Sequence, residues 1–168
     1  MRFLFRNRIG PYRIALSIGK VTDVEGINSN VVGGGHIVMW EFDITDYGEV
    51  WAALKTAQIE WNLPTITIAR SHPDGGFHAY CFPWVTWLQS LSIVASTAHV
   101  DEAYINLCAM RNHWTLRITD KGQGAPQYLA MIPSAVEPLC SFLDLASHVK
   151  YEAHTSKNII GWGMIERL

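Results

Sequence analysis

The sequence has few charged side chains and no long apolar run. Charged residues make up 17% of its 168 residues and hydrophobic residues 49%. This composition is typical of a chain that folds around a core. No stretch approaches the ~18 consecutive apolar residues of a membrane-spanning helix, and the N-terminal apolar run is too short for a signal peptide. We therefore expect a cytoplasmic protein with no membrane partner.

Cysteine and basic charge are also scarce. The three cysteines lie in apolar surroundings without C-x-x-C spacing, and no zinc-ligand spacing links them to the seven histidines. An odd number of cysteines without a framework favours a reducing compartment. The net charge of −2 gives the chain no overall basic footprint for duplex binding. The arginines are nevertheless unevenly spread, because four of them lie within the first thirteen residues: Arg2, Arg6, Arg8 and Arg13.

Common nucleotide-binding fingerprints are missing as well. The chain has no P-loop, and Gly33-Gly34-Gly35 precedes a strand pattern where a dinucleotide-binding motif would open a helix. Internal repeats, linkers and low-complexity tracts are absent too. We predict a single domain over residues 1–168, which is long enough to bury one core.

Hydrophobic periodicity and turn residues predict an α+β fold. Strands are expected over 2–6, 12–20, 36–43, 65–69, 77–82, 113–119, 126–132 and 159–165, helices over 46–61, 84–96, 101–111 and 135–147, and a loop over 23–35. The inward faces of the first and last helices are expected to carry Val50, Leu54, Ala57 and Trp61, and Leu139, Leu143 and Ala146. The irregular alternation of hairpins and helices favours a central mixed or antiparallel sheet flanked by helices.

Two acidic residues end the strand expected at 36–43. Residues i and i+2 of a strand share a face, so Glu41 and Asp43 are predicted to converge. Two carboxylates that faced the core without a partner would be costly. They therefore face water, a cation or a basic group, and Mg²⁺ or Mn²⁺ binds such a pair together with substrate phosphates. Two solvated acids at a strand end would look the same in the sequence.

A glycine-rich turn links the next two predicted strands. It runs Ser71-His72-Pro73-Asp74-Gly75-Gly76-Phe77-His78-Ala79-Tyr80. Glycine lets the backbone approach a ligand, and the amides of Gly75 and Gly76 can form an anion-binding nest. His78 follows on the strand, is expected to share a face with Tyr80, and can donate to a phosphate oxygen. An ordinary hairpin would use the same turn residues.

A third candidate group lies on the strand expected at 113–119. Arg117 is flanked by apolar residues and needs a partner, which a carboxylate or a phosphate in a cleft would supply. Asp120 and Lys121 follow it. They can be a metal ligand and a phosphate contact, or simply a turn.

The order of these motifs resembles the archaeo-eukaryotic primase superfamily, and in particular the small primase-polymerases of plasmids, phages and other mobile elements. The resemblance covers roughly residues 36–121. It implies a primase-polymerase core with an RRM-like sheet, with Glu41, Asp43 and Asp120 as catalytic metal ligands for Mg²⁺ or Mn²⁺. Asp101 is the alternative third acid. In the same comparison Ser71, Gly75, Gly76 and His78 grip the triphosphate, and Arg117 and Lys121 are phosphate contacts by their chemistry.

The function implied is metal-dependent nucleotidyl transfer with a nucleoside triphosphate and a DNA template, with a helicase or another replication protein as a possible partner. Some features depart from the family pattern: the first acid is Glu41, the Ser71–His78 spacing is slightly long, and Asp74 replaces a basic residue of some relatives. They keep open an inactive primase-like domain that binds nucleic acid or joins a larger replication or defence assembly.

One other enzymatic pattern is present. His113-Trp114-Thr115-Leu116 matches the His-x-Thr pattern of two-histidine phosphoesterases, and His154-Thr155-Ser156 is a candidate second copy. In such enzymes one histidine is the base and the other the acid, on two facing strands. Such an enzyme requires His113 and His154 to lie close together.

Overall fold

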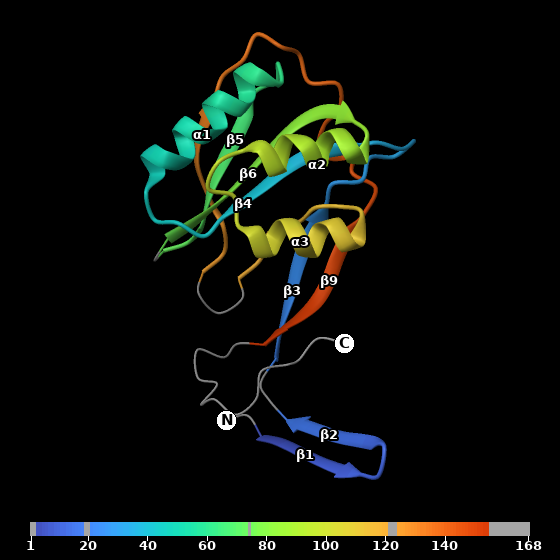
Figure 1. The fold of residues 1–168 in the computed structure, drawn as a ribbon. Helices are drawn as coiled ribbons and strands as arrows, with labels where there is room; N and C mark the ends of the chain where they lie inside the picture. The colour runs from blue at the N-terminus through green and yellow to red at the C-terminus, as the bar shows by residue number, and fades with distance from the viewer. Residues whose placement is uncertain (1–2, 19–20, 74, 121–123, 155–168) are drawn as a thin grey trace.

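The computed structural model describes residues 3–18, 21–73, 75–120 and 124–154 (Figure 1). Its strands are β1 (Phe3–Ile9), β2 (Tyr12–Ile18), β3 (Val21–Asn28), β4 (His36–Phe42), β5 (Ile66–His72), β6 (Gly75–Val85), β7 (Thr115–Arg117), β8 (Gln127–Ile132) and β9 (His148–His154). Its helices are α1 (Tyr47–Glu60), α2 (Trp87–Ser96) and α3 (Glu102–Arg111), with a short 3-10 turn, η1 (Phe142–Asp144). The α+β class predicted from the sequence is confirmed.

A four-stranded antiparallel sheet forms the centre of the molecule, in the order β4-β6-β5-β8. A three-stranded antiparallel sheet has the order β7-β3-β9, and β1 and β2 form a separate hairpin. The β5–β6 hairpin predicted from alternation and turn residues is present, with His72 opposite Gly75 at its turn. In the described residues every strand pairing is antiparallel, so the sheets are not mixed.

Helix α1 follows its sequence signals closely. The Asp46 carboxylate caps it, accepting from the amides of Gly48 (2.7 Å) and Glu49 (3.2 Å). Val50, Leu54 and Ala57 are buried as predicted. Trp61 was expected on the same stripe, and this prediction is wrong. It follows the helix, is 40% exposed and donates from Nε1 to Ser96 Oγ.

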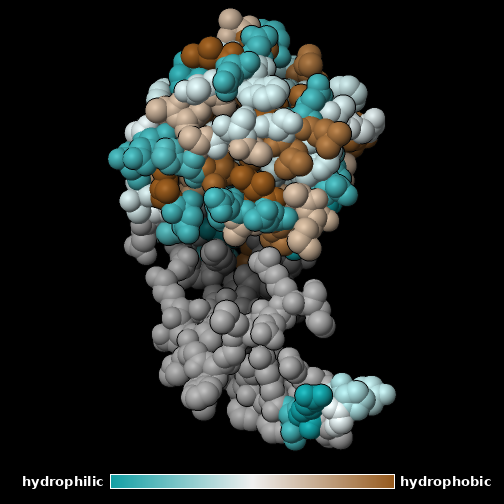
Figure 2. Space-filling model, in the orientation of Figure 1, coloured by the Kyte–Doolittle hydropathy of each residue, from teal (hydrophilic) through white to brown (hydrophobic). Residues whose placement is uncertain are grey.

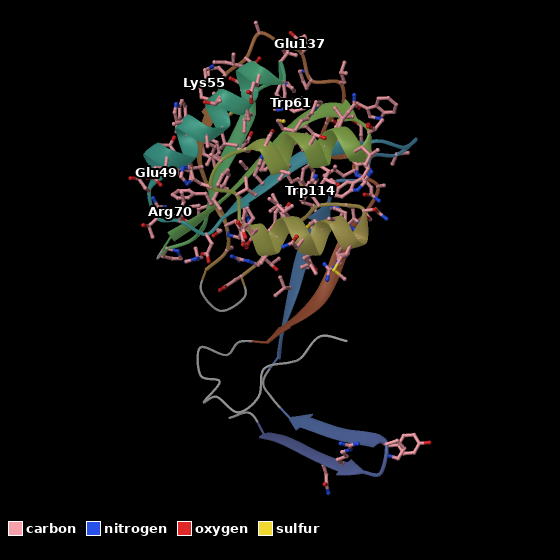
Figure 3. All side chains as sticks on the ribbon, in the orientation of Figure 1. Glu49, Lys55, Trp61, Arg70, Trp114 and Glu137 are labelled. Carbon is pink, nitrogen blue, oxygen red and sulfur yellow. The ribbon has the colours of Figure 1, made fainter. Side chains whose placement is uncertain are left out.

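Two buried tryptophans bond to the buried face of α2 and its C-cap. Trp40 of β4 donates from Nε1 to Thr97 Oγ1 at 3.0 Å, and Trp114 donates to Ser90 Oγ at 2.7 Å. The Trp114 ring also stacks on Tyr104 of α3, with centroids 5.2 Å apart. Burying an indole requires a partner for its N–H, and α2 supplies it in both cases. Figure 3 shows Trp114 between the levels of α2 and α3.

The outer surface over α2 and α3 mixes polar and apolar groups (Figure 2). Its apolar members include Leu88, Leu107 and Met110, all well exposed. None of the helices in the described ranges is both long and apolar enough to cross a membrane.

Two segments differ from their predicted structure. The loop expected at 23–35 begins as β3, in which Gly26 passes so close to β7 that a Cβ there would lie 2.9 Å from the Leu116 carbonyl oxygen. The helix expected at 135–147 is absent, and Leu139 and Leu143 are 73% and 92% exposed. Pro138 interrupts that stretch because it has no amide hydrogen and clashes with the preceding turn, so only η1 forms. The segment is held instead by Leu139, whose N–H donates to the Phe82 carbonyl.

The C-terminal strand also lies elsewhere than expected. Residues 148–154 form β9 beside β3, in a stretch with no predicted element. The strand predicted at 159–165 lies outside the described residues.

Candidate functional site

The two faces of the four-stranded sheet have different coverings. Helices α1 and α2 lie over one face (Figure 1). On that face, the Phe77 ring lies 6.0 Å from Tyr47 of α1, and Trp40 bonds to the C-cap of α2. The candidate site lies on the opposite face, because it is built from the residues that alternate with Trp40 and Phe77.

Strand register places two rows of side chains across this opposite face, which we call the open face. Glu41 pairs with His78, His78 with Ala69, and Ala69 with Tyr128. The adjacent row consists of Met39, Tyr80, Thr67 and Met131. Directly opposed residues on antiparallel strands share a face with Cβ atoms about 5 Å apart. Four strands therefore bring an acid, a histidine and two tyrosines to one surface.

The closest polar pair of the site is His78 with Glu41. Their Nε2 and Oε1 atoms are 3.9 Å apart, with the histidine buried and the glutamate side chain 40% exposed. Glu41 thus contacts both His78 and solvent. The sequence predicted both residues as site members, and the structure brings them together.

Arg117 lies at the edge of the same face and is 7% exposed. Its guanidinium donates to the Ser71 carbonyl (2.6 Å), the Thr119 carbonyl (2.6 Å) and the Gly124 carbonyl (3.1 Å). The sequence interpretation looked to a carboxylate or a phosphate as its partner. Three backbone carbonyls accept from it, so it joins β5 to the segment after β7.

A cleft of about 170 Å³ opens between these groups. His78, Tyr80, Arg117 and Tyr128 supply its polar lining, and its apolar lining comes from Ile27, Ala69, Leu116, Ile118 and Pro126. One water in the liquid occupies about 30 Å³, so the cleft has room for a phosphate-sized group. Drug-sized ligands fill roughly 300–1,000 Å³, so a whole nucleotide would extend out of it over the sheet.

Tyr80 is a neutral hydrogen-bonding group in this cleft. Burial raises the pKa of its hydroxyl, and Tyr128 adds to the effect against an opposing contribution from the Thr67 hydrogen bond. The sequence placed Tyr80 on the His78 face, but did not identify Tyr128 or Thr67. Both come from strands that pair with β5 or β6, and no short-range pattern reveals that register.

The glycine turn is shaped by close packing. Gly75 and Gly76 have φ of +139° and +72°, and a Cβ on Gly76 would lie 2.6 Å from Ser71 Oγ. The Ser71 hydroxyl donates to the Gly75 carbonyl at 3.4 Å. The Gly76 amide donates to the Ile44 carbonyl at 3.1 Å. The anion nest expected from the sequence therefore lacks the Gly76 amide, because the Ile44 carbonyl, two residues beyond β4, already accepts from it.

The predicted acids are dispersed. Asp43 lies one residue beyond β4 and is exposed, while the Asp120 carboxylate accepts from the Gly124 amide at 2.7 Å. The backbone of Asp101 lies beside Glu41, because the Asp101 amide donates to the Glu41 carbonyl at 2.9 Å. The Asp101 carboxylate, however, caps α3 by accepting from the Ala103 amide. In the described part of the chain, no three His, Cys, Asp or Glu residues gather as a metal-binding group. A trio of Glu41, Asp43 and Asp120 is therefore not formed there, and Lys121 lies outside the described residues.

The two-histidine alternative is wrong on geometric grounds. His154 pairs with Val21 at one end of β3, and Thr115, two residues after His113, pairs with Asn28 at the other end. Seven residues of strand span roughly 23 Å at 3.3 Å per residue. An acid and a base at that separation cannot act on one phosphate.

No family model, curated protein or solved structure matches this chain. The resemblance to primase-polymerases therefore rests on the order of motifs alone.

Proposed function

We propose that the open face of the four-stranded sheet binds a nucleoside triphosphate for metal-dependent nucleotidyl transfer of the primase-polymerase type. The observation that carries this proposal is the Glu41–His78 pair beside a phosphate-sized cleft edged by Arg117. An acid, a histidine and a buried cation on one face are the groups that phosphoryl chemistry requires.

Glu41 and Asp43 are the residues that would hold Mg²⁺ or Mn²⁺. Glu41 lies on β4 and Asp43 one residue beyond its end, and both reach solvent. Such cations accept one or two carboxylates together with substrate phosphates and water. A divalent cation bound there would neutralise charge on the triphosphate and polarise its phosphorus–oxygen bonds. Asp120 is not needed for this donor set.

His78 is the group we assign to the triphosphate. It is buried at the floor of the cleft, two residues before Tyr80, and its register position fixes it beside Glu41. A ring held in this way donates a hydrogen bond without losing further side-chain freedom on binding. Arg117 acts on the same anion through its charge, while its hydrogen bonds keep the cleft wall in place.

The template would lie along the remainder of the open face. Tyr128 is 66% exposed beside the cleft, and Tyr80 and Phe82 lie edge to face with centroids 5.8 Å apart. Aromatic rings on a sheet surface stack unpaired bases at about 1–3 kcal/mol per base. A single-stranded template agrees with this arrangement, while a helicase or another replication protein as a partner stays a prediction from the resemblance.

Calorimetry with Mn²⁺ and a non-hydrolysable nucleoside triphosphate tests the nucleotide site. We expect His78→Gln to weaken metal-dependent binding at least tenfold, or ~1.4 kcal/mol, and Asp43→Asn to remove the metal dependence. Glu60→Gln is the matched control, since this exposed acid lies at the far end of α1. Absence of binding by the unmodified protein would overturn the proposal.

A second candidate is a primase-like domain that binds nucleic acid without catalysis. The specific observations that favour it are the dispersed acids and the engagement of the Gly76 amide. It predicts that Asp43→Asn leaves oligonucleotide binding unchanged and that the unmodified protein does not extend a primer. Metal-dependent primer extension that Asp43→Asn abolishes would exclude it.

A further inference from the structure

The β1–β2 hairpin is a cationic element attached to an acidic remainder. Residues 1–18 contain four arginines and no Asp or Glu, and the whole chain carries −2, which leaves −6 for residues 19–168. Figure 1 shows the hairpin beyond the far end of β3 and β9. Its two strands pair with each other and with no other described strand.

The register of the hairpin gathers the arginines on one face. Arg8 lies directly opposite Arg13, and Arg6, two residues before Arg8, lies opposite Ala15. Directly opposed residues share a face, and so do residues i and i+2 of one strand. Arg6, Arg8 and Arg13 therefore occupy a single face, with Arg6 and Arg8 about 7 Å apart along the strand.

The opposed positions of Arg8 and Arg13 favour a bound anion. Like charges directly opposite one another destabilise an antiparallel pair, and a lone two-stranded hairpin is marginally stable at best. A phosphate shared by Arg8 and Arg13 would turn the repulsion into two charge-assisted contacts, because guanidinium groups match phosphate geometry.

We propose that the β1–β2 hairpin binds the phosphate backbone of single-stranded nucleic acid. Its tip favours this partner over a lipid surface, since the exposed residues there are Asn7, Arg8, Gly10, Pro11 and Tyr12. Arginine and asparagine bond phosphates, and an exposed aromatic ring such as Tyr12, 73% exposed, can stack on a base. A hairpin that inserts into a bilayer would carry several apolar residues at this end, where the sequence has Ile9 beside Asn7, Arg8 and Arg13. The inference uses the hairpin alone and does not depend on the cleft around His78.

The test is fluorescence anisotropy of a labelled single-stranded oligonucleotide with the full chain, over a range of salt concentrations. Each lost phosphate contact lowers the slope of log K against log salt by about 0.7. Arg8→Gln with Arg13→Gln should lower the slope by about 1.4 and weaken binding roughly 25-fold at 0.1 M salt. Arg111→Gln is the control, because Arg111 is an exposed arginine at the end of α3. This variant should leave the salt slope and the affinity at 0.1 M salt unchanged.

Two further measurements keep the result interpretable. The double lysine variant, Arg8→Lys with Arg13→Lys, should preserve most of the slope, because the charge remains. Vesicles of phosphatidylcholine with phosphatidylserine serve as the competing polyanion. An unchanged slope in the double glutamine variant would overturn the proposal, as would arginine-dependent binding to vesicles but not to the oligonucleotide. His78→Gln should leave the salt slope intact, which separates this inference from the proposed function.

Discussion

The two faces of the four-stranded sheet divide stability from chemistry. On the helix-covered face, register aligns Trp40, Ala79 and Ile68, all of them buried. One residue further along the same strands, Glu41, His78 and Ala69 align on the open face. The same hydrogen-bonded backbone thus carries an apolar layer and a polar layer, because side chains alternate along every strand.

This division has a physical consequence for each layer. Side chains under α1 and α2 fill a close-packed space, so a change in volume there is felt throughout the core. On the open face, paired backbones fix the positions of His78 and Glu41, and a side chain that reaches solvent, such as Tyr128, can be exchanged at little structural cost. Substitutions on each face test this division through their effect on the free energy of unfolding.

The largest effect should come from an aromatic truncation under the helices. Trp40→Ala removes a fully buried indole and leaves Thr97 Oγ1 without its donor. We expect a loss of about 3–5 kcal/mol in the free energy of unfolding, measured by urea denaturation. Tyr128→Ala, an aromatic truncation on the open face with the ring 66% exposed, should cost less than about 1 kcal/mol. Equal losses in the two variants would contradict the division between the faces.

A smaller but substantial loss is expected at the border of the open face. Arg117→Met retains most of the side-chain volume but removes the donors to the carbonyls of Ser71, Thr119 and Gly124. Leaving such acceptors without partners should cost about 2–3 kcal/mol. Thermal unfolding measures the loss, and Arg111→Met on the exposed end of α3 is the control. If Arg117→Met were as stable as the unmodified protein, the three hydrogen bonds would not contribute to the stability of the fold.

The next effect concerns the turn that leads into the His78 strand. Gly76→Ala places a Cβ 2.6 Å from Ser71 Oγ at a φ of +72°. Gly34→Ala has a similar φ of +96° with nothing within 4 Å, so it reports the backbone cost alone. We expect about 1 kcal/mol for Gly34→Ala and about 2 kcal/mol for Gly76→Ala. Adding Ser71→Ala to Gly76→Ala should recover part of the difference, and no recovery would show that the contact is not the cause.

Local signals in the sequence were enough for elements whose determinants are close together. The Asp46 cap and the stripe of Val50, Leu54 and Ala57 define α1, and alternation around a Pro-Asp-Gly-Gly turn defines the β5–β6 hairpin. The period of two also placed His78 and Tyr80 on one face. Elements fixed by distant partners were missed: β3 and β9 form because they pair with each other across more than a hundred residues.

The candidate site shows the same limit. Glu41 and His78 were each identified from their own strands, but their approach to 3.9 Å depends on the register of β4 with β6. Arg117 was correctly expected to need a partner. Its carbonyl partners come from β5 and the segment before β8, and backbone acceptors leave no residue pattern in a sequence. Pro138 shows the opposite case, in which a local signal against a helix was present and outweighed by apolar spacing.

The smallest effect should appear with pH, at the α2 end of the helix-covered face. His36 packs against Trp87, with ring centroids 5.3 Å apart, and its Nδ1 lies 3.0 Å from Ser29 Oγ. Burial lowers the pKa of His36, and His113 lowers it further. Because the unfolded chain then binds the proton more readily than the folded one, stability is complete above pH ~6.5 and falls as the pH drops below it.

Urea denaturation between pH 7.5 and pH 5 measures this loss. We expect His36→Gln to flatten the decline, because it removes a group that the unfolded state protonates more readily than the folded state. His148→Gln, on β9 and exposed, replaces a histidine outside the central sheet and should retain the decline. A slope unchanged by His36→Gln would mean that the helix-covered face holds no proton-sensitive group at this position.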